Sequence, residues 1–271
     1  MRKLLRVNIF RLRRSKMLWL CMACTFVLMV VSLLKIGAGN EQICTLDEAV
    51  SQIIPVLPVF QAAFAGLFLG AEYQDGTLRS KLIAGHSRRT VYAAFLVTVI
   101  LGCFAILMAW ALGTVVGILR FGWFTAPVGQ LLLLNAAVLL LLTAANAAIM
   151  TLLGMLCSGR AVAVVMVLIF LLMIGVSSTF YNALCEPEFQ TAAVITENGI
   201  EVGEAQPNPD YVGGTLRMVY RFLVDTLPSG QAILLADQEL THPVGSLCVS
   251  AGIVLLMSAV GLVTFKRIDL K

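Results

Sequence analysis

The residues best suited to chemistry gather in a polar segment, 72–89, which separates two long apolar runs. Its carboxylates, guanidinium groups and hydroxyls can form charge-assisted hydrogen bonds with another protein. Asp75-Gly76-Thr77 has the composition of a turn followed by a helix N-cap, with Thr77 as the capping residue. Gly85-His86-Ser87 would end that helix, and Ser87 would cap the next one. The segment therefore predicts a short helix between two longer ones.

This short helix carries both apolar and charged residues. Leu78, Leu82 and Ile83 are spaced to form an apolar face, and Arg79 and Lys81 flank that face with charge. A helix of this kind can enter a groove on a partner protein. The alternative is an ordinary positively charged loop with a structured turn on the cytoplasmic side of a membrane protein.

A weaker polar signal lies in a long apolar run further along the chain. Asn135 and Asn146 are about 20° from eclipsed on a helix of ~3.6 residues per turn, so they share one face. These two side chains could line a translocation path. They could equally form interhelical hydrogen bonds or pack against a partner subunit in a dimer.

Motifs for enzymatic chemistry are missing from the sequence. It contains no GxxxxGKS/T phosphate-binding loop, no HExxH and no GxSxG. His86 and His242 fall on opposite sides of the membrane that the apolar runs imply, so they cannot share a metal. No apolar run carries a charged residue in its middle, which argues against an ion pathway. We therefore expect no catalytic residue, no metal site and no cofactor bound by this chain.

The elements that would position these residues are membrane-spanning helices. The chain is 59% hydrophobic and only 13% charged, whereas soluble domains carry roughly 25% charged residues. Its apolar runs are long enough to cross the ~30 Å hydrocarbon core as helices. The sequence predicts an all-α integral membrane protein with a single transmembrane domain, 1–271. The six spans are expected at about 17–34, 53–70, 92–119, 128–157, 161–181 and 245–265.

Positive charge is divided unequally between the segments that join these spans. Of the 19 lysines and arginines, one alternating set of segments holds only Lys35, Arg120, Arg217 and Arg221. Positively charged segments stay cytoplasmic during insertion. Both chain ends and the segment 72–89 are therefore predicted to be cytoplasmic, in a multi-pass protein of the cell membrane. Basic clusters beside the spans indicate contact with anionic membrane lipid rather than with nucleic acid.

The N-terminus and the second span carry further structural signals. Residues 1–16 are basic, and their apolar residues predict an amphipathic helix on the inner membrane surface. Its apolar face would consist of Leu5, Ile9 and Leu12. Pro55 and Pro58 should kink the outer end of the second span or delay its start.

The long outer loop, 182–244, is acidic in its first part. The stretch 215–236 is apolar and is interrupted at Pro228-Ser229-Gly230, which predicts one or two short re-entrant helices that dip back toward the membrane. A disulfide between Cys44 and Cys185 would require an oxidising exterior.

The arrangement of these residues resembles that of one protein family. The segment 72–89 is similar to the first cytoplasmic loop of type-two ABC exporter permeases at Glu72, Gly76-Thr77, Leu82 and Ser87-Arg88. The basic N-terminus, the six spans, Leu227-Pro228-Ser229-Gly230 and the C-terminal 265–271 also resemble that family. The likeness covers essentially the whole chain and is closest to single-polypeptide permeases of the bacitracin- and lantibiotic-resistance kind.

The resemblance implies that this segment is a coupling helix that meets a separate ABC ATPase subunit, on which ATP and Mg would bind. The coupling interface would comprise Glu72, Asp75, Gly76, Thr77, Leu78, Arg79, Leu82, Ser87 and Arg88. Glu72 would accept a hydrogen bond from a basic ATPase residue, and Arg79 and Arg88 would pair with acids of the ATPase or with lipid phosphates. A second permease, identical or paralogous, would complete a central path. The exported substrate would be hydrophobic or amphipathic, for example a peptide antibiotic.

Two other classes of function stay open on the sequence alone. The chain could be a membrane sensor or scaffold that works with an ATPase but transports nothing. It could also be a channel or an uncoupled carrier. Co-purification with an ATPase separates the uncoupled proteins from the others.

Overall fold

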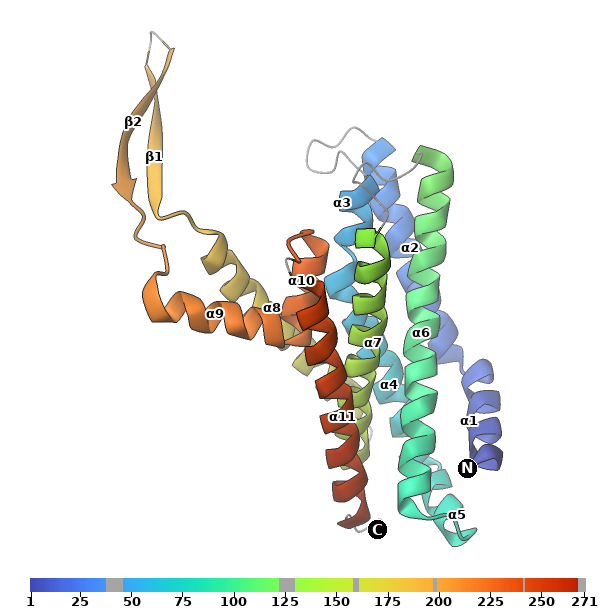
Figure 1. The fold of residues 1–271 in the computed structure, drawn as a ribbon. Coiled ribbons are helices and arrows are strands. Elements are labelled where there is room, and N and C mark those ends of the chain that lie inside the picture. Colours follow the sequence, from blue (N-terminus) through green and yellow to red (C-terminus); the bar gives the residue numbers. More distant parts are fainter. Residues whose placement is uncertain (38–45, 122–129, 158–160, 197–198, 241, 268–271) are drawn as a thin grey trace.

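Six long helices dominate the computed structural model, which describes residues 1–37, 46–121, 130–157, 161–196, 199–240 and 242–267 (Figure 1). Within these residues, all six are apolar and long enough to cross a membrane, and this confirms the predicted all-α membrane architecture. They are α2 (Lys16–Gly37), α4 (Leu57–Gln74), α6 (Arg88–Phe121), α7 (Gln130–Leu156), α8 (Val162–Cys185) and α11 (Pro243–Arg267).

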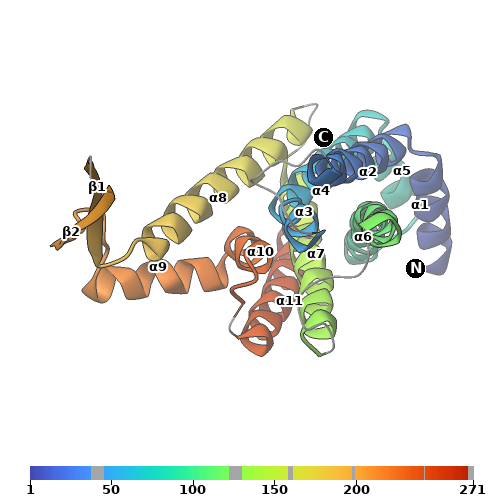
Figure 2. The same ribbon diagram turned by 90° about the horizontal axis from the view of Figure 1, so that it is seen from above.

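Shorter elements join or flank these helices. They are α1 (Arg2–Arg14), α3 (Leu46–Ser51), the 3₁₀ turn η1 (Ile54–Val56), α5 (Thr77–Ile83), β1 (Phe189–Thr196), β2 (Gly199–Pro207), α9 (Gly214–Thr226) and α10 (Pro228–Ala236). The helices α1 and α5 lie toward the same end of the bundle as the end of α11, whereas α3 and the strands lie toward the other end (Figure 1). Both views show α9 lengthwise, and Figure 2 shows α6 end-on, so α9 runs across the bundle axis.

The second span starts late, as its prolines predict. Pro55 lies in the 3₁₀ turn, and Pro58 occupies the first turn of α4. Proline is tolerated there because the first-turn N–H groups of a helix have no intrahelical acceptor. The α-helix therefore begins only at Leu57 and runs without interruption to Gln74.

Two apolar clusters hold the bundle together. The one nearer α5 contains the buried rings of Phe64, Tyr92 and Phe95, and the other contains Met29 and Leu107. The helices α8 and α11 contribute less to the packing of the bundle, since only 22% and 11% of their most apolar stretches are buried. The outward faces of these two helices are thus available to lipid or to another protein.

The acidic segment predicted as the outer loop contains a β-hairpin, which the sequence analysis does not predict. β1 and β2 pair antiparallel from Phe189 opposite Pro207 to Thr196 opposite Gly199, with an irregularity between Thr191 and Ala193. The hairpin projects beyond the end of α8, away from the bundle (Figures 1 and 2).

Of the one or two short helices predicted in the stretch 215–236, two are present. α9 and α10 are separated at Leu227, directly before the expected interruption. Ser229 of α10 hydrogen-bonds Ser177 of α8 at 2.6 Å, and Ser250 of α11 donates to Gln231 of α10 at 2.8 Å. These contacts place α10 between two spans. Cys44 lies outside the described residues, so its pairing with the exposed Cys185 stays a prediction.

Candidate functional site

The segment between α4 and α6 folds as a short helix with a glycine turn on each side. Gly76 has φ 61° and Gly85 has φ 85°, left-handed conformations that other residues rarely adopt. Between these turns, α5 extends over Thr77–Ile83. Ser87 caps the start of α6 as predicted, because the backbone N–H of Thr90 donates to its Oγ at 3.3 Å.

Thr77 does not have the predicted capping role. The N-cap of α5 is Gly76, and no side chain caps the helix. The Thr77 hydroxyl instead lies 3.1 Å from the backbone carbonyl of Glu72 and within hydrogen-bonding distance of the Glu72 carboxylate. A buried carboxylate needs hydrogen-bond donors, and this need explains the inward turn of the hydroxyl.

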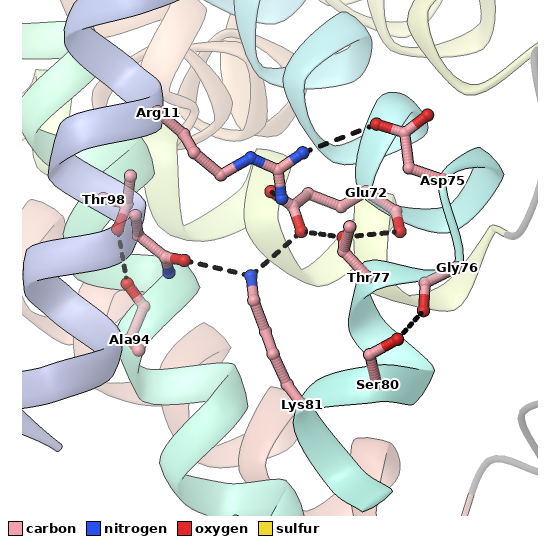
Figure 3. A network of polar contacts seen from close by, with 10 residues as sticks. Arg11, Glu72, Asp75, Gly76, Thr77, Ser80, Lys81, Ala94 and Thr98 are labelled. Atoms are coloured by element: carbon pink, nitrogen blue, oxygen red, sulfur yellow. Dashed lines mark hydrogen bonds and ion pairs between the residues drawn. The ribbon is translucent and has the colours of Figure 1, made fainter. Parts of the chain in front are cut away.

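Glu72 is the centre of a network of polar contacts (Figure 3). It lies in the last turn of α4 and is only 1% exposed. The Arg11 guanidinium lies 2.5 Å from Oε1 as an ion pair without hydrogen-bond geometry, and Lys81 donates to Oε2 at 2.9 Å. The carboxylate is therefore neutralised within its own chain. A partner protein cannot reach it without breaking these contacts.

Lys81 joins α5 to three other helices. Its ammonium group contacts Glu72 of α4, donates to Asn8 Oδ1 of α1 at 3.0 Å, and lies 4.2 Å from the ring centroid of Phe95 in α6. Burial lowers the pKa of Lys81, and the Glu72 carboxylate opposes part of this shift. Lys81, predicted to flank the apolar face with charge, thus points into the bundle, because the carboxylate and the aromatic ring draw it inward.

The amphipathic helix α1 is present, but its buried face differs from the predicted one. Leu12 is buried and Leu5 packs against the core, as predicted. Leu4 and Asn8 are also buried, whereas Ile9 is exposed. This register brings Asn8 to Lys81, and the neighbouring Arg11 to Glu72 and to Asp75, whose carboxylate it contacts at 3.4 Å. The face of α1 is therefore set by polar contacts with α4 and α5 as well as by apolar burial.

The opposite face of α5 is open. Leu78 is buried and Leu82 packs against the core, as expected for an apolar face. Ile83, predicted to share one apolar face with Leu78 and Leu82, is instead 78% exposed. Because Lys81 occupies the inward direction near the end of α5, Ile83 points away together with the exposed Arg79.

The remaining predicted residues stand on α6 and α7. Ser87 and Arg88 stand at the start of α6. On α7, Asn135 is partly exposed, whereas Asn146 is 2% exposed and its Oδ1 has no hydrogen-bond partner among the described residues. A role for both asparagines in a path or a dimer face stays a prediction.

Four residues of the site are absent from the sequence-based prediction: Asn8, Arg11, Phe95 and Tyr73, whose hydroxyl donates to the Met155 carbonyl at 2.6 Å. The sequence signal that could have led to these residues was Glu72 itself. A carboxylate at the end of an apolar helix requires a nearby cation if it becomes buried. The abundant basic residues of the N-terminus could supply one, although the sequence does not say which.

A hollow of about 750 Å³ lies between α8, α9, α10 and α11, on another side of the molecule from α5. Its ionisable lining has both signs of charge, with Arg217, Arg221, Asp225, Glu239 and His242. Arg217 is already bound to the Leu184 and Val212 carbonyls. This mixed lining selects no ligand charge. In the described part of the chain, no group of His, Cys, Asp and Glu could hold a metal ion.

Comparison with known proteins gives one match. A family model described as "ABC-2 family transporter protein" matches residues 4–178, from α1 through most of α8 and including α5 and its network. No curated protein and no solved structure matches the chain.

Proposed function

Because the chain belongs to the ABC-2 family of transporter proteins, we propose that it is the membrane permease of an ATP-driven exporter, with α5 as its coupling helix. Permeases of this family are transmembrane components of ABC transporters and work with an ATPase. In this proposal, the bundle end that carries α1 and α5 is cytoplasmic. A separate subunit binds ATP and Mg there and contacts α5.

The observation that supports this role is the two-sided character of α5. One side is fixed to α1, α4 and α6 through Lys81, whose ammonium contacts all three helices. On the other side of α5, the side chains of Ile83 and Arg79 are exposed. A helix that is rigidly attached inward and open outward is suited to passing a displacement from a partner into the bundle.

The network defines which helices would move with α5. Glu72 belongs to α4, so a force on α5 reaches that span through the Lys81 ion pair as well as through the short turn at Gly76. The Arg11 ion pair carries the same force to α1. Glu72 thus acts as a positioning residue within the chain, and the exposed residues of α5 contact the ATPase.

The docking role of α5 is tested by replacing Ile83 with alanine. An exposed apolar side chain that becomes an interface anchor contributes about 2 kcal/mol, which corresponds to roughly 30-fold in affinity. We expect the Ile83→Ala permease to insert normally and to bind its ATPase about 30-fold more weakly. Binding is measured between the purified permease in nanodiscs and the purified ATPase of its operon or neighbouring gene.

Leu119→Ala is the matched control, since Leu119 is 82% exposed and lies at the far end of α6 from α5. It should leave ATPase binding unchanged. If both variants bind the ATPase as tightly as the parent chain, α5 is not the docking surface. If no ATPase binds the parent chain, the coupled-exporter proposal fails and an uncoupled carrier is favoured.

The substrate we propose is a hydrophobic or amphipathic molecule, including peptide antibiotics, and a second permease would complete the path. The exposed apolar faces of α8 and α11 offer surface for such a partner or for lipid. A reconstituted ATPase assay with candidate peptides and lipids tests the substrate. Stimulation without transport in the same vesicles would favour a sensor or scaffold.

A further inference from the structure

The hollow of about 750 Å³ between α8, α9, α10 and α11 lies where two spans end. Its lining includes Leu184 and Cys185 from the last turn of α8, and Gly245 and Ser246 from the first turn of α11. The ends of membrane-spanning helices lie close to the lipid head groups. The start of α11 is the end of that span farther from α5 (Figure 1). The hollow therefore opens at the membrane interface opposite to α5.

The short helix α9, which forms one wall of the hollow, indicates the same level. It runs across the bundle axis, as an amphipathic helix on a membrane surface does (Figures 1 and 2). The apolar side chains of Met218, Val219 and Phe222 are exposed, whereas Val224 is buried. Phe222 also lines the hollow and is 66% exposed. A ligand in the hollow thus has carbon surface beside it, where lipid acyl chains begin.

Four ionisable side chains of the lining are exposed and have no hydrogen bond or ion pair with any residue that the structure describes. They are Arg221 and Asp225 of α9, Glu239 after α10 and His242 before α11. Opposite charges four positions apart on a helix are neighbours and can pair, yet among the described residues no ion pair joins Arg221 to Asp225. Arg217 differs from these four, because it is bound to two backbone carbonyls. The hollow therefore offers a ligand one unengaged guanidinium and two unengaged carboxylates.

We propose that the hollow binds one zwitterionic phospholipid of the phosphatidylethanolamine kind. Its phosphate lies at Arg221, its ammonium group donates to Asp225 and Glu239, and its acyl chains begin along Phe222. The mixed lining selects neither an anion nor a cation, but it matches a ligand that carries both charges. The volume of about 750 Å³ lies within the range of small-molecule sites, roughly 300–1,000 Å³. Below the hollow, the mostly unburied faces of α8 and α11 leave apolar surface for the chains.

The test is a binding measurement on the purified full chain in detergent, without the ATPase. Dioctanoyl phosphatidylethanolamine is titrated, and bound lipid is counted by native mass spectrometry. We expect one tightly retained molecule. Dioctanoyl phosphatidylglycerol should bind at least about tenfold more weakly, because it has no ammonium group and the two carboxylates repel its charge. Glycerophosphoethanolamine, the same head group without chains, should also bind at least about tenfold more weakly, because it buries no acyl carbon.

Variants of the charged residues test each half of the head group. Arg221→Ala should weaken phosphatidylethanolamine binding about fivefold, since a Lys or Arg beside a lipid phosphate contributes about 1 kcal/mol. Arg120→Ala is the matched control, because it removes the same charge from an exposed residue of α6 outside the lining. Asp225→Asn combined with Glu239→Gln should remove the preference for phosphatidylethanolamine over phosphatidylglycerol. Equal losses in Arg221→Ala and Arg120→Ala, or an unchanged preference in the double variant, overturn the site.

Gly245→Trp tests the hollow without changing its charge. A side chain is sterically possible at this position, since a Cβ there would lie 3.7 Å from the nearest atom, the Cβ of His242. The tryptophan should fill the hollow and abolish lipid retention, while far-UV circular dichroism shows an intact helical fold. Retention that survives this substitution places the lipid elsewhere on the chain and overturns the site.

Two further results would assign the hollow to another occupant. Glycerophosphoethanolamine that binds as tightly as the lipid would show a site for a free zwitterion. Phosphatidylglycerol that binds as tightly would show that the carboxylates take no part. Either result overturns the proposed lipid. Because binding is measured on the permease alone and far from α5, failure here leaves the Ile83 docking test unaffected.

Discussion

Replacing Lys81 with methionine is expected to lower the free energy of unfolding of the permease by about 3 kcal/mol, the lower end of the cost of breaking a buried ion pair. The lower end applies because Arg11 still neutralises the buried Glu72 carboxylate after the substitution. Methionine keeps the length of the side chain and its packing near Phe95, but it leaves Glu72 Oε2 without its ammonium donor and Asn8 without its partner.

The same substitution is expected to reduce substrate-stimulated ATP hydrolysis at least about tenfold, equivalent to about 1.4 kcal/mol. The reason is mechanical: α5 would still dock through Ile83, but it would no longer be fixed to α1, α4 and α6. Docking affinity for the ATPase should therefore stay near that of the parent chain. This combination of intact docking and lost stimulation distinguishes a coupling defect from a failure of assembly.

A double-mutant cycle isolates the ion pair from other effects of these substitutions. Glu72→Gln should insert normally and reduce stimulated hydrolysis, and combining it with Lys81→Met should cost about 1–3 kcal/mol less than the sum of the single changes. Arg79→Met is the matched control on the exposed side of α5, with an expected change within about 0.5 kcal/mol. If Lys81→Met and Arg79→Met unfold at the same temperature, the network does not hold α5 in place.

The spans were predictable because a single physical requirement sets them. A helix that crosses hydrocarbon must be apolar along its whole length, and this pattern survives whatever neighbours the helix has. The late start of α4 was predictable for a similar reason, since proline restricts the backbone locally at Pro55 and Pro58. Ser87 as a helix cap also depends only on residues three positions away.

The partners of Glu72 could not be predicted in this way. Arg11 lies in another helix far away along the chain, and the N-terminus offers several arginines at nearly every angle around α1. Which of them meets Glu72 depends on how α1 is rotated, and this rotation is fixed partly by the contact between Asn8 and Lys81. An apolar-periodicity argument ranks Asn8 as a surface residue, so it placed Leu5 and Leu12 on the buried face but chose Ile9 in place of Asn8.

The missed hairpin has a different cause. Its sequence contains Asn198-Gly199, a dipeptide that favours tight hairpin turns. The flanking strands contain few large apolar residues, because the hairpin projects away from the bundle and packs against little of it (Figure 1). The strands show no strong alternation of polar and apolar residues in the sequence, so Asn198-Gly199 was the main local signal for them.

Gly66→Ala is expected to destabilise the permease by about 2–3 kcal/mol, as overpacking in a dense core does. Gly66 lies in α4 on the face that packs against α8, and a Cβ at this position would overlap the backbone Cα of Ala163. A backbone atom cannot move aside as a side chain does, so the two spans would have to separate. The substitution enlarges the side chain by one methyl group and adds no charge.

Gly175→Ala is the matched control for this prediction. Gly175 lies in α8, and a Cβ there meets no atom within 4 Å. The control should therefore unfold at or slightly above the temperature of the parent chain, because alanine has the higher helix propensity. The measurement is thermal unfolding of both variants in the same detergent. An unfolding temperature for Gly66→Ala equal to that of Gly175→Ala would mean that α4 and α8 separate without cost. Close packing against α8 would then not be what holds α4, and with it Glu72, in position next to α5.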